Sequence, residues 1–312
     1  MKTHAFGVDL GGTTTKIGLF TVDGTLVKKV EFPTDTKDQG EAILPNIARA
    51  VDEMMVGRGI APFEVVGIGM GVPGAVLNDN YVLRCANLNN WGGPVSDELG
   101  ALTGFTVKLA NDANAAALGE YFNGGGKGYN SIVFTTIGTG IGSGIIIDGK
   151  LIPGCNGAAG EIGHIKVAEP NEDICGCGKS GCLERYASAN GIVRQAIKAL
   201  SSTSTPSVLR EFEELTCKDV IDSARDGDLI ALEVFDNTTK LLGKAFATVS
   251  CVCDPDIFVI GGGMSKAGDF LLDRIRKHYR EYAFPFAEDT EFALAKLEND
   301  AGIYGAVHMI LK

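Results

Sequence analysis

Alternating apolar and polar positions open the chain and predict a β-meander. The stretches AFGVDLGG and KIGLFTVDGTLVKKVEF give strands with a Gly-Gly-Thr turn between the first two, and Asp23-Gly24 predicts a type I′ hairpin. A helical period then runs from about Asp38 to Val56, with apolar positions at Ile43, Ile47, Val51 and Met54. VVGIGMGVPG and FTVKLAND predict buried strands, and DANAAALGEYF predicts a helix that begins at Asp112.

The opening pattern returns later in the chain. The stretch SIVFTTIGTGIGSGIIIDGKLI again gives a strand, a glycine-rich turn, a second strand and an Asp-Gly hairpin. Aligning Asp148 with Asp23 sets an offset of 125 residues and matches IIIDGKLI to FTVDGTLV. Two unrelated hairpins could share the common Asp-Gly turn, but a Gly/Thr-rich turn precedes both of these. We therefore interpret the two stretches as the starts of an internal repeat.

The rest of the chain is mostly helical. Helical periodicity marks RYASANGIVRQAIKAL, VLREFEELT, VIDSARDGD, LIALEVFDNTTKLLGKAFATVSCV and FLLDRIRKHYREY, and AGIYGAVHMILK is expected to form the last helix. DPDIFVIGGGMS predicts a buried strand that enters a triple-glycine turn. Strands that alternate with helices predict an α/β architecture, and 312 residues favour two domains.

Composition narrows the class of protein. The chain has 45% hydrophobic residues, enough to bury a large core, and a net charge of −11 that would repel nucleic acid. The N-terminal MKTHAFGVDLGG reaches a glycine turn at once, unlike a signal peptide, and no apolar run approaches the roughly 20 residues of a membrane helix. These features predict a cytoplasmic protein with no membrane partner. Its eight cysteines are then expected to be thiols or metal ligands rather than disulfides.

Three glycine-rich turns at strand ends, residues 9–16, 138–142 and 261–263, are candidate phosphate-binding loops. Glycine backbone lets an oxyanion approach, successive N–H groups form an anion nest, and Thr13 and Thr14 add hydroxyl donors. Asp9 is a candidate ligand for Mg²⁺ through water. Each turn taken alone could be only a tight turn, although three at strand ends favour a ligand. No Walker A sequence is present, nor a G-x-G-x-x-G that opens a βαβ unit.

The dipeptide Asn111-Asp112 lies where a predicted strand meets a predicted helix. Asp is among the best helix N-caps, so a structural role is one interpretation. The other is a general base, because open α/β sheets bind ligands beyond the carboxyl ends of their strands. The sequence alone leaves both interpretations of Asp112 open.

A cysteine-rich block, CGCGKSGCLE, follows the motif EIGH at residues 161–164. His164, Cys175, Cys177 and Cys182 offer one imidazole and three thiolates, a set that suits a closed structural Zn²⁺ site. The intervening glycines let the short loop curl around an ion. A Cys-x-Cys redox pair would need neither the third cysteine nor the histidine, and a disulfide knot would be unusual in a cytosolic chain. We therefore favour zinc.

These motifs together resemble the ROK family of bacterial sugar kinases and repressors. The resemblance rests on DLGGTTTK, GVPG, the Asn-Asp pair, GTGIG, the ExGH motif, CGCGKSGCLE and the late GGG, and it covers essentially the whole chain. DLGG alone marks the wider actin-like ATPase superfamily, whereas the ExGH motif with the cysteine block is highly specific. GCLERYASANGI looks most like the glucokinase branch.

The resemblance implies an α/β, actin-like ATPase (ribonuclease H-like) fold with a ligand cleft between two domains. ATP with Mg²⁺ would bind there, and the 6-hydroxyl of a hexose, first of all glucose, would attack the γ-phosphate. Asp112 matches the family's catalytic base. The family's sugar-binding positions match Gly74, Asn111, Asp112, Glu161, His164 and Glu184. Its phosphate, Mg²⁺ and adenosine positions match Asp9, Gly11, Gly12, Thr13, Gly138, Thr139, Gly261, Gly262, Gly263 and Met264.

The resemblance also implies a domain division and an oligomeric state. Because the family returns its C-terminal helix to the N-terminal domain, residues 1–110 and 300–312 are expected to form the smaller domain. Residues 111–299 are expected to form the larger domain with the zinc loop. A homodimer or homotetramer is implied.

The alternatives to a glucose kinase differ in class of protein, in sugar and in phosphoryl donor. A sugar-responsive repressor needs a DNA-binding helix-turn-helix, and only eight residues precede Asp9. An actin-like assembly ATPase would not require the cysteine block. The runner-up substrates are N-acetylglucosamine and N-acetylmannosamine, with mannose and fructose also open. Inorganic polyphosphate is an alternative phosphoryl donor.

Overall fold

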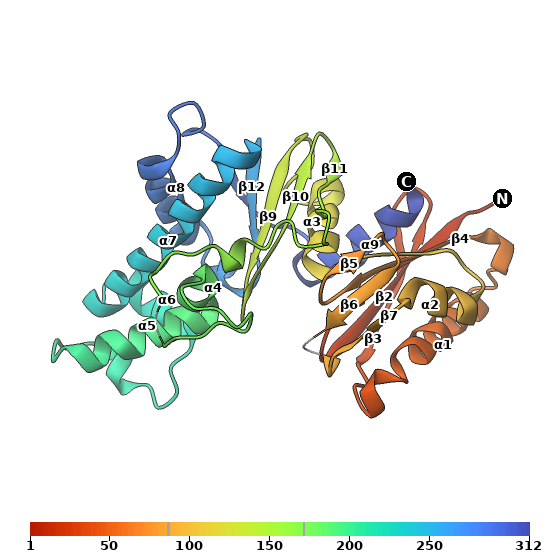
Figure 1. The fold of residues 1–312 in the computed structure, drawn as a ribbon, viewed down its shortest axis with the longest axis horizontal. Coiled ribbons are helices and arrows are strands. Elements are labelled where there is room, and N and C mark those ends of the chain that lie inside the picture. The colour runs from red at the N-terminus through yellow and green to blue at the C-terminus, as the bar shows by residue number, and fades with distance from the viewer. Residues whose placement is uncertain (86–87, 171) are drawn as a thin grey trace.

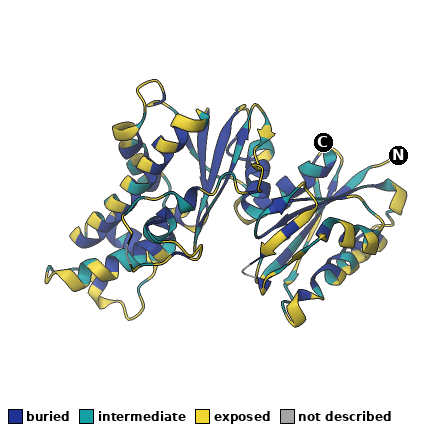
Figure 2. Cartoon of the chain, in the orientation of Figure 1, coloured by how far each residue is buried: buried dark blue, intermediate teal, exposed yellow. Residues whose placement is uncertain are grey.

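The computed structural model describes residues 1–85, 88–170 and 172–312 of the chain. Two five-stranded sheets form the halves of the molecule, and a small three-stranded sheet accompanies the first (Figure 1). Buried residues concentrate in the sheets and on the helix faces that cover them (Figure 2). The fold is therefore α/β with two separate cores.

The first sheet has the strand order β3-β2-β1-β4-β8. Its opening meander is antiparallel, whereas β4 and β8 add in parallel. Its strands, with those of the small sheet β5-β6-β7, are β1 (His4–Leu10), β2 (Thr14–Thr21), β3 (Leu26–Pro33), β4 (Val65–Val72), β8 (Val107–Asn111), β5 (Val76–Leu77), β6 (Tyr81–Cys85) and β7 (Trp91–Gly93).

The second sheet has the order β11-β10-β9-β12-β13 and repeats the pairing of the first. The pair β9–β10 is antiparallel, β10–β11 is antiparallel, and β12 and β13 add in parallel. The predicted internal repeat is thus confirmed at the level of topology. The strands are β9 (Ile132–Ile137), β10 (Ile141–Ile147), β11 (Lys150–Leu151), β12 (Ile257–Gly261) and β13 (Glu291–Leu294).

Helices cover both faces of each sheet, which explains the almost continuous burial of β4 and β12. On the first sheet, α1 (Ile43–Val56) and α2 (Val95–Thr103) lie on one face and α9 (Ala301–Leu311) on the other. On the second sheet, α3 (Asp112–Asn123) lies on one face. The opposite face carries α4 (Leu183–Ala187), α5 (Ala189–Ser202), α6 (Cys217–Arg225), α7 (Leu229–Cys253) and α8 (Asp269–Tyr282).

The two halves meet through α3 and α9, which lie against each other in the middle of the molecule (Figure 1). Their contact is built from glycine and alanine: a Cβ on Gly305 would lie 1.6 Å from the carbonyl oxygen of Ala115. A Cβ on Gly119 would lie 2.2 Å from the carbonyl oxygen of Ala301. The C-terminal helix therefore returns to the first sheet and brings the two termini to the same half.

Several sequence predictions of local structure need correction. The helix expected from Asp38 begins at Ile43, because Gln39 and Gly40 take positive φ angles of 58° and 79° within the short 3₁₀ turn Asp38–Gly40. Its predicted apolar positions are buried as expected. VLREFEELT forms only a 3₁₀ turn at Val208–Glu211. The helix expected across RYASANGIVRQAIKAL is broken at Ser188, whose backbone is extended and whose hydroxyl caps α5.

The two Asp-Gly hairpins differ in turn geometry. At Asp148 and Gly149 both φ angles are positive, 49° and 74°, as a type I′ turn requires. At the first hairpin only Gly24 has a positive φ, so the predicted type I′ turn is wrong there. The Asp23 carboxylate instead accepts hydrogen bonds from the hydroxyl of Thr21 and, at 3.1 Å, from the amide of Thr25. This side-chain pairing stabilises a wider four-residue loop.

None of the helices in residues 1–85, 88–170 and 172–312 has the length and apolar character that a bilayer crossing requires.

Candidate active site

A cavity of about 1010 Å³ lies between the two sheets. Its wall includes the ends of β1 and β12, the loop after β4, the turn between β9 and β10, and the first residues of α3 and α9. Eleven of the site residues predicted from the sequence line it: Asp9, Gly74, Asp112, Gly138, Thr139, Glu161, His164, Glu184, Gly261, Gly262 and Gly263. Residues more than 250 positions apart in sequence thus converge on one cavity.

The other predicted residues are near the cavity without lining it. The turn at Gly11–Thr14 is closed by a 3.0 Å hydrogen bond from the Gly11 amide to the Thr14 carbonyl oxygen. Gly12 and Thr13 are exposed at its tip. Met264 is buried beneath the triple-glycine turn and supports it from inside.

Asp112 is the first residue of α3 and is not the helix cap. The cap is Asn111, whose Oδ1 accepts hydrogen bonds from the amides of Ala113 at 2.9 Å and Asn114 at 3.3 Å. The Asp112 carboxylate accepts a 2.8 Å bond from the Ala113 amide and lines the cavity. Burial, assisted by the nearby charge of Glu161, raises its pKa. A carboxylate of raised pKa facing a cavity is suited to accept a proton.

The predicted sugar-binding residue Asn111 is not among the residues that line the cavity. Besides capping α3, its Nδ2 donates a 3.1 Å hydrogen bond to the carbonyl oxygen of Gly74. The amide therefore holds the loop after β4 against the start of α3. In this conformation Asn111 positions Gly74 and Asp112, and its own side chain does not line the cavity.

Asp9 lies at the end of β1, beside the start of α9. A Cβ on Gly302 would come within 2.5 Å of its carboxyl carbon, so glycine is needed for this approach. Burial raises the pKa of Asp9 to about 6; Lys16 opposes this increase, and Asp112 adds to it. Lys16 thus compensates the buried carboxylate only in part, and a divalent metal would supply the remaining positive charge.

This pKa predicts a pH-dependent gain of stability on Asp9→Asn. A carboxyl whose pKa is about 6 when folded and 3.8 when unfolded binds more protons in the folded state. Stability is therefore lost as pH rises between these values, and the loss is complete above pH 6. Removing the charge should raise the free energy of unfolding by roughly 3 kcal/mol at pH 8, and by less at pH 5.

Urea unfolding of both proteins at pH 5 and pH 8, in magnesium-free buffer, measures this difference. Asp35→Asn, which changes an aspartate outside the cavity, is the matched control. A variant at Asp9 that is less stable than wild type at pH 8 would contradict the electrostatic account.

Two glycine turns of the second sheet form the far wall. The β9–β10 turn contributes Gly138 to Gly142, and the turn after β12 contributes Gly261 to Gly263. Gly262 has a φ of 81° and packs its Cα against the backbone of Ile137, so the two turns support each other. Bare backbone at strand ends is suited to phosphate and to the flat face of a nucleotide.

A polar cluster beside the β9–β10 turn contains Glu161, His164 and Glu184. The Nε2 atom of His164 lies 3.7 Å from a carboxylate oxygen of Glu161. Glu184, in the first turn of α4, accepts a 2.8 Å hydrogen bond from the amide of Ile141. Glu184 thereby ties the α4 segment to the glycine turn between β9 and β10.

The predicted metal-ligand set is assembled next to this cluster. Donor atoms of His164, Cys175, Cys177 and Cys182 all lie within 4.8 Å of one another. The Nδ1 of His164 is 3.7 Å from Cys175 Sγ, and the sulfurs of Cys177 and Cys182 are 3.6 Å apart. A tetrahedral zinc with Zn–S bonds of about 2.3 Å separates its ligands by nearly these distances. The Cys₃His cluster therefore fits a structural zinc.

Several lining residues were not predicted as site residues. Lys16 and Lys266 bring positive charge to a wall that otherwise carries carboxylates, and Glu298 and Asn299 come from the loop before α9. The Nζ of Lys16 donates a 2.8 Å hydrogen bond to the Asn299 carbonyl oxygen. Lys266 could have been found from its place just after the triple glycine. No motif marks Glu298, which reaches the site only because the chain crosses back to the first sheet there.

Comparison with known proteins places this geometry in a family. The model of the ROK family matches residues 5–312. The chain belongs to the ROK family. It is 41% identical to a glucokinase of Halalkalibacterium halodurans, over 96% of this chain and 92% of that protein. A solved ROK family glucokinase from Streptomyces griseus, in complex with glucose and AMPPNP, matches with a TM-score of 0.78 and 33% identity over 98% of each chain. An N-acetyl-D-glucosamine kinase of Erwinia tasmaniensis is 29% identical over 98% of this chain and 99% of that protein.

The family resemblance inferred from the motifs is thus confirmed, and with it the two-domain, actin-like ATPase fold. The two repeated sheets and the cavity between them are the features of this chain that correspond to that fold.

Proposed function

We propose that this ROK protein is a glucokinase, which transfers the γ-phosphoryl group of ATP to the 6-hydroxyl of glucose. One observation carries the proposal: a single cavity is lined by a carboxylate of raised pKa, a cluster of polar side chains and the two glycine turns at 138–142 and 261–263. The glucokinases among its relatives support the choice of substrate.

In the proposed reaction Asp112 accepts the proton of the 6-hydroxyl. The hydroxyl oxygen forms a bond to the γ-phosphorus while the bond from that phosphorus to the β,γ-bridging oxygen breaks, and ADP leaves with the electron pair. Phosphoryl transfer has a loose transition state, so positioning and charge stabilisation contribute more than covalent chemistry. Asn111 would fix the start of α3 and so aim the Asp112 carboxylate at the sugar.

We assign the phosphates of ATP to the part of the cavity where the end of β1 faces the turn between β9 and β10. Asp9 would hold Mg²⁺ through water, which neutralises phosphate charge, and the backbone at Gly138 and Thr139 would contact the phosphate oxygens. The turn Gly261–Gly263 would take the adenosine. The tip of the turn at Gly12 and Thr13 would reach the phosphates when the two halves close, which also excludes competing water.

The sugar is assigned to the polar cluster. Glu161, His164 and Glu184 would form hydrogen bonds with the ring hydroxyls of the sugar. Gly74 would line the part of the sugar site near Asp112. Because Glu184 also bonds the amide of Ile141, a sugar that engages Glu184 would fix the neighbouring glycine turn. Sugar and nucleotide sites are thereby linked through one side chain.

We propose further that the Cys₃His cluster holds one structural Zn²⁺. The ion would close the loop that carries Glu184 and would leave the Nε2 of His164 facing the cavity, beside Glu161. With four protein ligands it has no open position for water, so its contribution is structural.

The zinc proposal predicts one zinc per chain by elemental analysis of protein purified without chelators. Cys182→Ser should lower this content and weaken glucose binding, because Cys182 is the N-cap residue of α4 and Glu184 lies in the first turn of that helix. Cys251→Ser, an exposed cysteine outside the cluster, is the matched control and should keep its zinc. A fully active wild-type protein without metal would refute this assignment.

The test of the function is ADP release from ATP and Mg²⁺ across a sugar panel, with a no-sugar blank. The panel contains glucose, mannose, fructose, N-acetylglucosamine and N-acetylmannosamine. Preference for glucose is expected. An N-acetylhexosamine kinase is the second candidate, which the N-acetyl-D-glucosamine kinase among the relatives supports. Preference for such a sugar would keep the mechanism and change the substrate. Silence with every sugar, with ATP and with polyphosphate alike, would reject the kinase.

Other features stay predictions. One of them is the division into residues 1–110 with 300–312 and residues 111–299, which the two-sheet architecture supports and which assigns Asn111, the last residue of β8, to the larger domain. A homodimer or homotetramer and a cytoplasmic location are further expectations. Polyphosphate as the donor is tested by replacing ATP in the same assay.

A further inference from the structure

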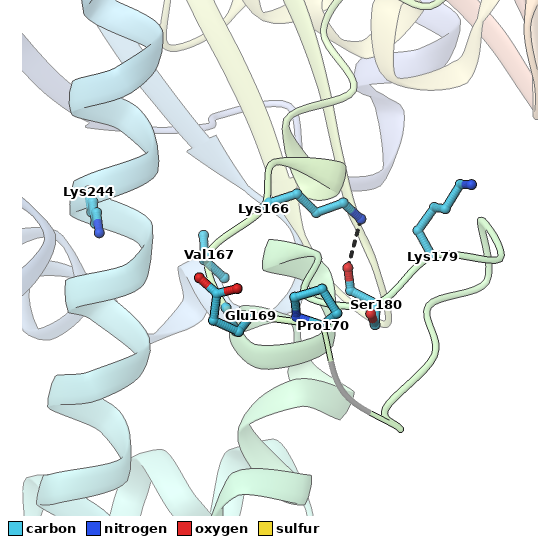
Figure 3. Close-up of a pocket in the computed structure, with 8 residues that line it drawn as sticks. Lys166, Val167, Glu169, Pro170, Lys179, Ser180 and Lys244 are labelled. Atoms are coloured by element: carbon cyan, nitrogen blue, oxygen red, sulfur yellow. Dashed lines mark hydrogen bonds between the residues drawn. The ribbon is translucent and has the colours of Figure 1, made fainter.

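Lys166 reaches the cysteine cluster from outside the active-site cavity. Its Nζ lies 2.8 Å from the Sγ of Cys182 and donates a second 2.8 Å hydrogen bond to the carbonyl oxygen of Ser180. The side chain lies along a hollow of about 610 Å³ that Lys179 and Lys244 also line (Figure 3). The Lys166 side chain bonds a sulfur of the cluster directly, whereas Lys179 reaches the sulfur of Cys177 through its backbone amide.

The charge of the cluster explains why an ammonium belongs there. Three thiolates and a neutral imidazole around Zn²⁺ carry a net charge of −1. Cys182 is fully buried, so water does not solvate the excess charge on its sulfur. A hydrogen bond from a cation to that sulfur compensates the charge, because charge-assisted hydrogen bonds are the strong ones. Outer partners of metal ligands commonly set metal affinity.

The backbone around Lys166 gives this contact a structural consequence. Lys166 forms an antiparallel bridge with Cys182. The flanking amides of Val167 and Leu183 donate 2.8 Å bonds to the carbonyl oxygens of Gly181 and Ile165. The paired segments lead directly to the two residues that line the cavity, His164 on one and Glu184 on the other.

We propose that Lys166 is a positioning residue of the zinc centre: its ammonium compensates the Cys182 thiolate, strengthens zinc retention and so keeps His164 and Glu184 in place. The inference rests on the proposed zinc site. It assigns no catalytic step to Lys166, and it predicts an effect on the metal that can be measured without turnover.

The test uses full-length, zinc-loaded protein and the variants Lys166→Met and Lys166→Arg. Methionine keeps the length of the side chain without its charge, whereas arginine restores a cation. Lys179→Met, in the same hollow, is the matched control. Zinc transfer to the chromogenic chelator 4-(2-pyridylazo)resorcinol measures affinity, and thermal unfolding with zinc bound confirms that each variant folds.

Lys166→Met should bind zinc about 10–100-fold more weakly than wild type, the usual effect of losing an outer partner. Lys166→Arg should retain most of the affinity, and Lys179→Met should match wild type. In Co²⁺-loaded protein the thiolate-to-cobalt absorption band should shift in Lys166→Met alone.

The outcomes separate the two proposals. If wild-type protein binds no zinc, both the zinc site and the role of Lys166 are wrong. If wild type binds zinc and Lys166→Met behaves like Lys179→Met, the zinc site stands and the role of Lys166 is rejected. Equal losses in the methionine and arginine variants would assign the effect to side-chain shape, and would also overturn the charge argument.

Discussion

Substitution of Asp112 by asparagine is expected to lower turnover by about 10²–10⁴-fold, the usual contribution of a general base. Asparagine has nearly the same shape, and Asn111 still caps α3, so the fold and glucose binding should be preserved. The loss should therefore appear in kcat at saturating glucose and ATP. Steady-state kinetics and calorimetric glucose binding together measure it.

Asp97→Asn is the matched control, because Asp97 is an exposed acidic residue in the first turn of α2. It should leave kcat unchanged. The raised pKa of Asp112 adds a second signature, since the base must be ionised to act. In wild type, kcat should fall on the acid side at a pH higher than an ordinary aspartate with a pKa of 3.8 would give. Turnover of Asp112→Asn within a few-fold of wild type would remove Asp112 from the role.

The fold was predictable where the chain carries a strong local period. Strands such as β1 and β4 and the repeat of the opening hairpin follow from alternation and glycine turns, and the helix register at Ile47 and Val51 was right. The boundaries of the elements were not predictable, because they depend on single backbone angles. For example, Gln39 has a φ of 58°, and α1 begins only after it, at Ile43. VLREFEELT has helical periodicity, yet only a short 3₁₀ turn forms there, anchored where Asp228 accepts a 2.9 Å bond from the Val208 amide.

The site was predictable where motifs mark strand ends. Asp9, Asp112 and the glycine turns line the cavity because strand ends of both sheets meet there. Asn111 shows the limit: the sequence does not reveal that its amide is already used by the helix amides and by the Gly74 carbonyl oxygen. Lys166 is a second case, because its partner Cys182 is 16 residues away and is met only through the β-bridge.

A second limit concerns glycine. The sequence does not reveal whether a given glycine is needed for a turn or for close contact with another element. Gly24 and Gly262 have positive φ angles and belong to turns. Gly305 lies inside a helix, where glycine is unfavourable. A glycine is needed there because the backbone of helix α3 leaves no room for a Cβ. That reason can be tested because α3 and α9 are the elements that join the two halves.

Gly305→Ala is expected to lower the free energy of unfolding by about 1–3 kcal/mol, the usual cost of overpacking, or by more. The added Cβ would lie 1.6 Å from the Ala115 carbonyl oxygen and 2.6 Å from the Gly119 nitrogen, both of them backbone atoms. A backbone cannot rotate away as a side chain does, so the two helices must separate. The melting temperature should fall by roughly 2–4 °C for each kcal/mol.

Gly100→Ala provides the matched control, because Gly100 also lies inside a helix, α2, and its Cβ would meet only the Phe105 carbonyl oxygen at 3.2 Å. There the gain in helix propensity offsets a small steric cost, so the melting temperature should change little. If the melting temperatures of Gly305→Ala and Gly100→Ala are the same, then α3 and α9 are not in tight contact. If it melts lower while the glucose affinity and kcat also fall, separation of the helices has misplaced Asp9 and Asp112, which lie at the starts of that same contact.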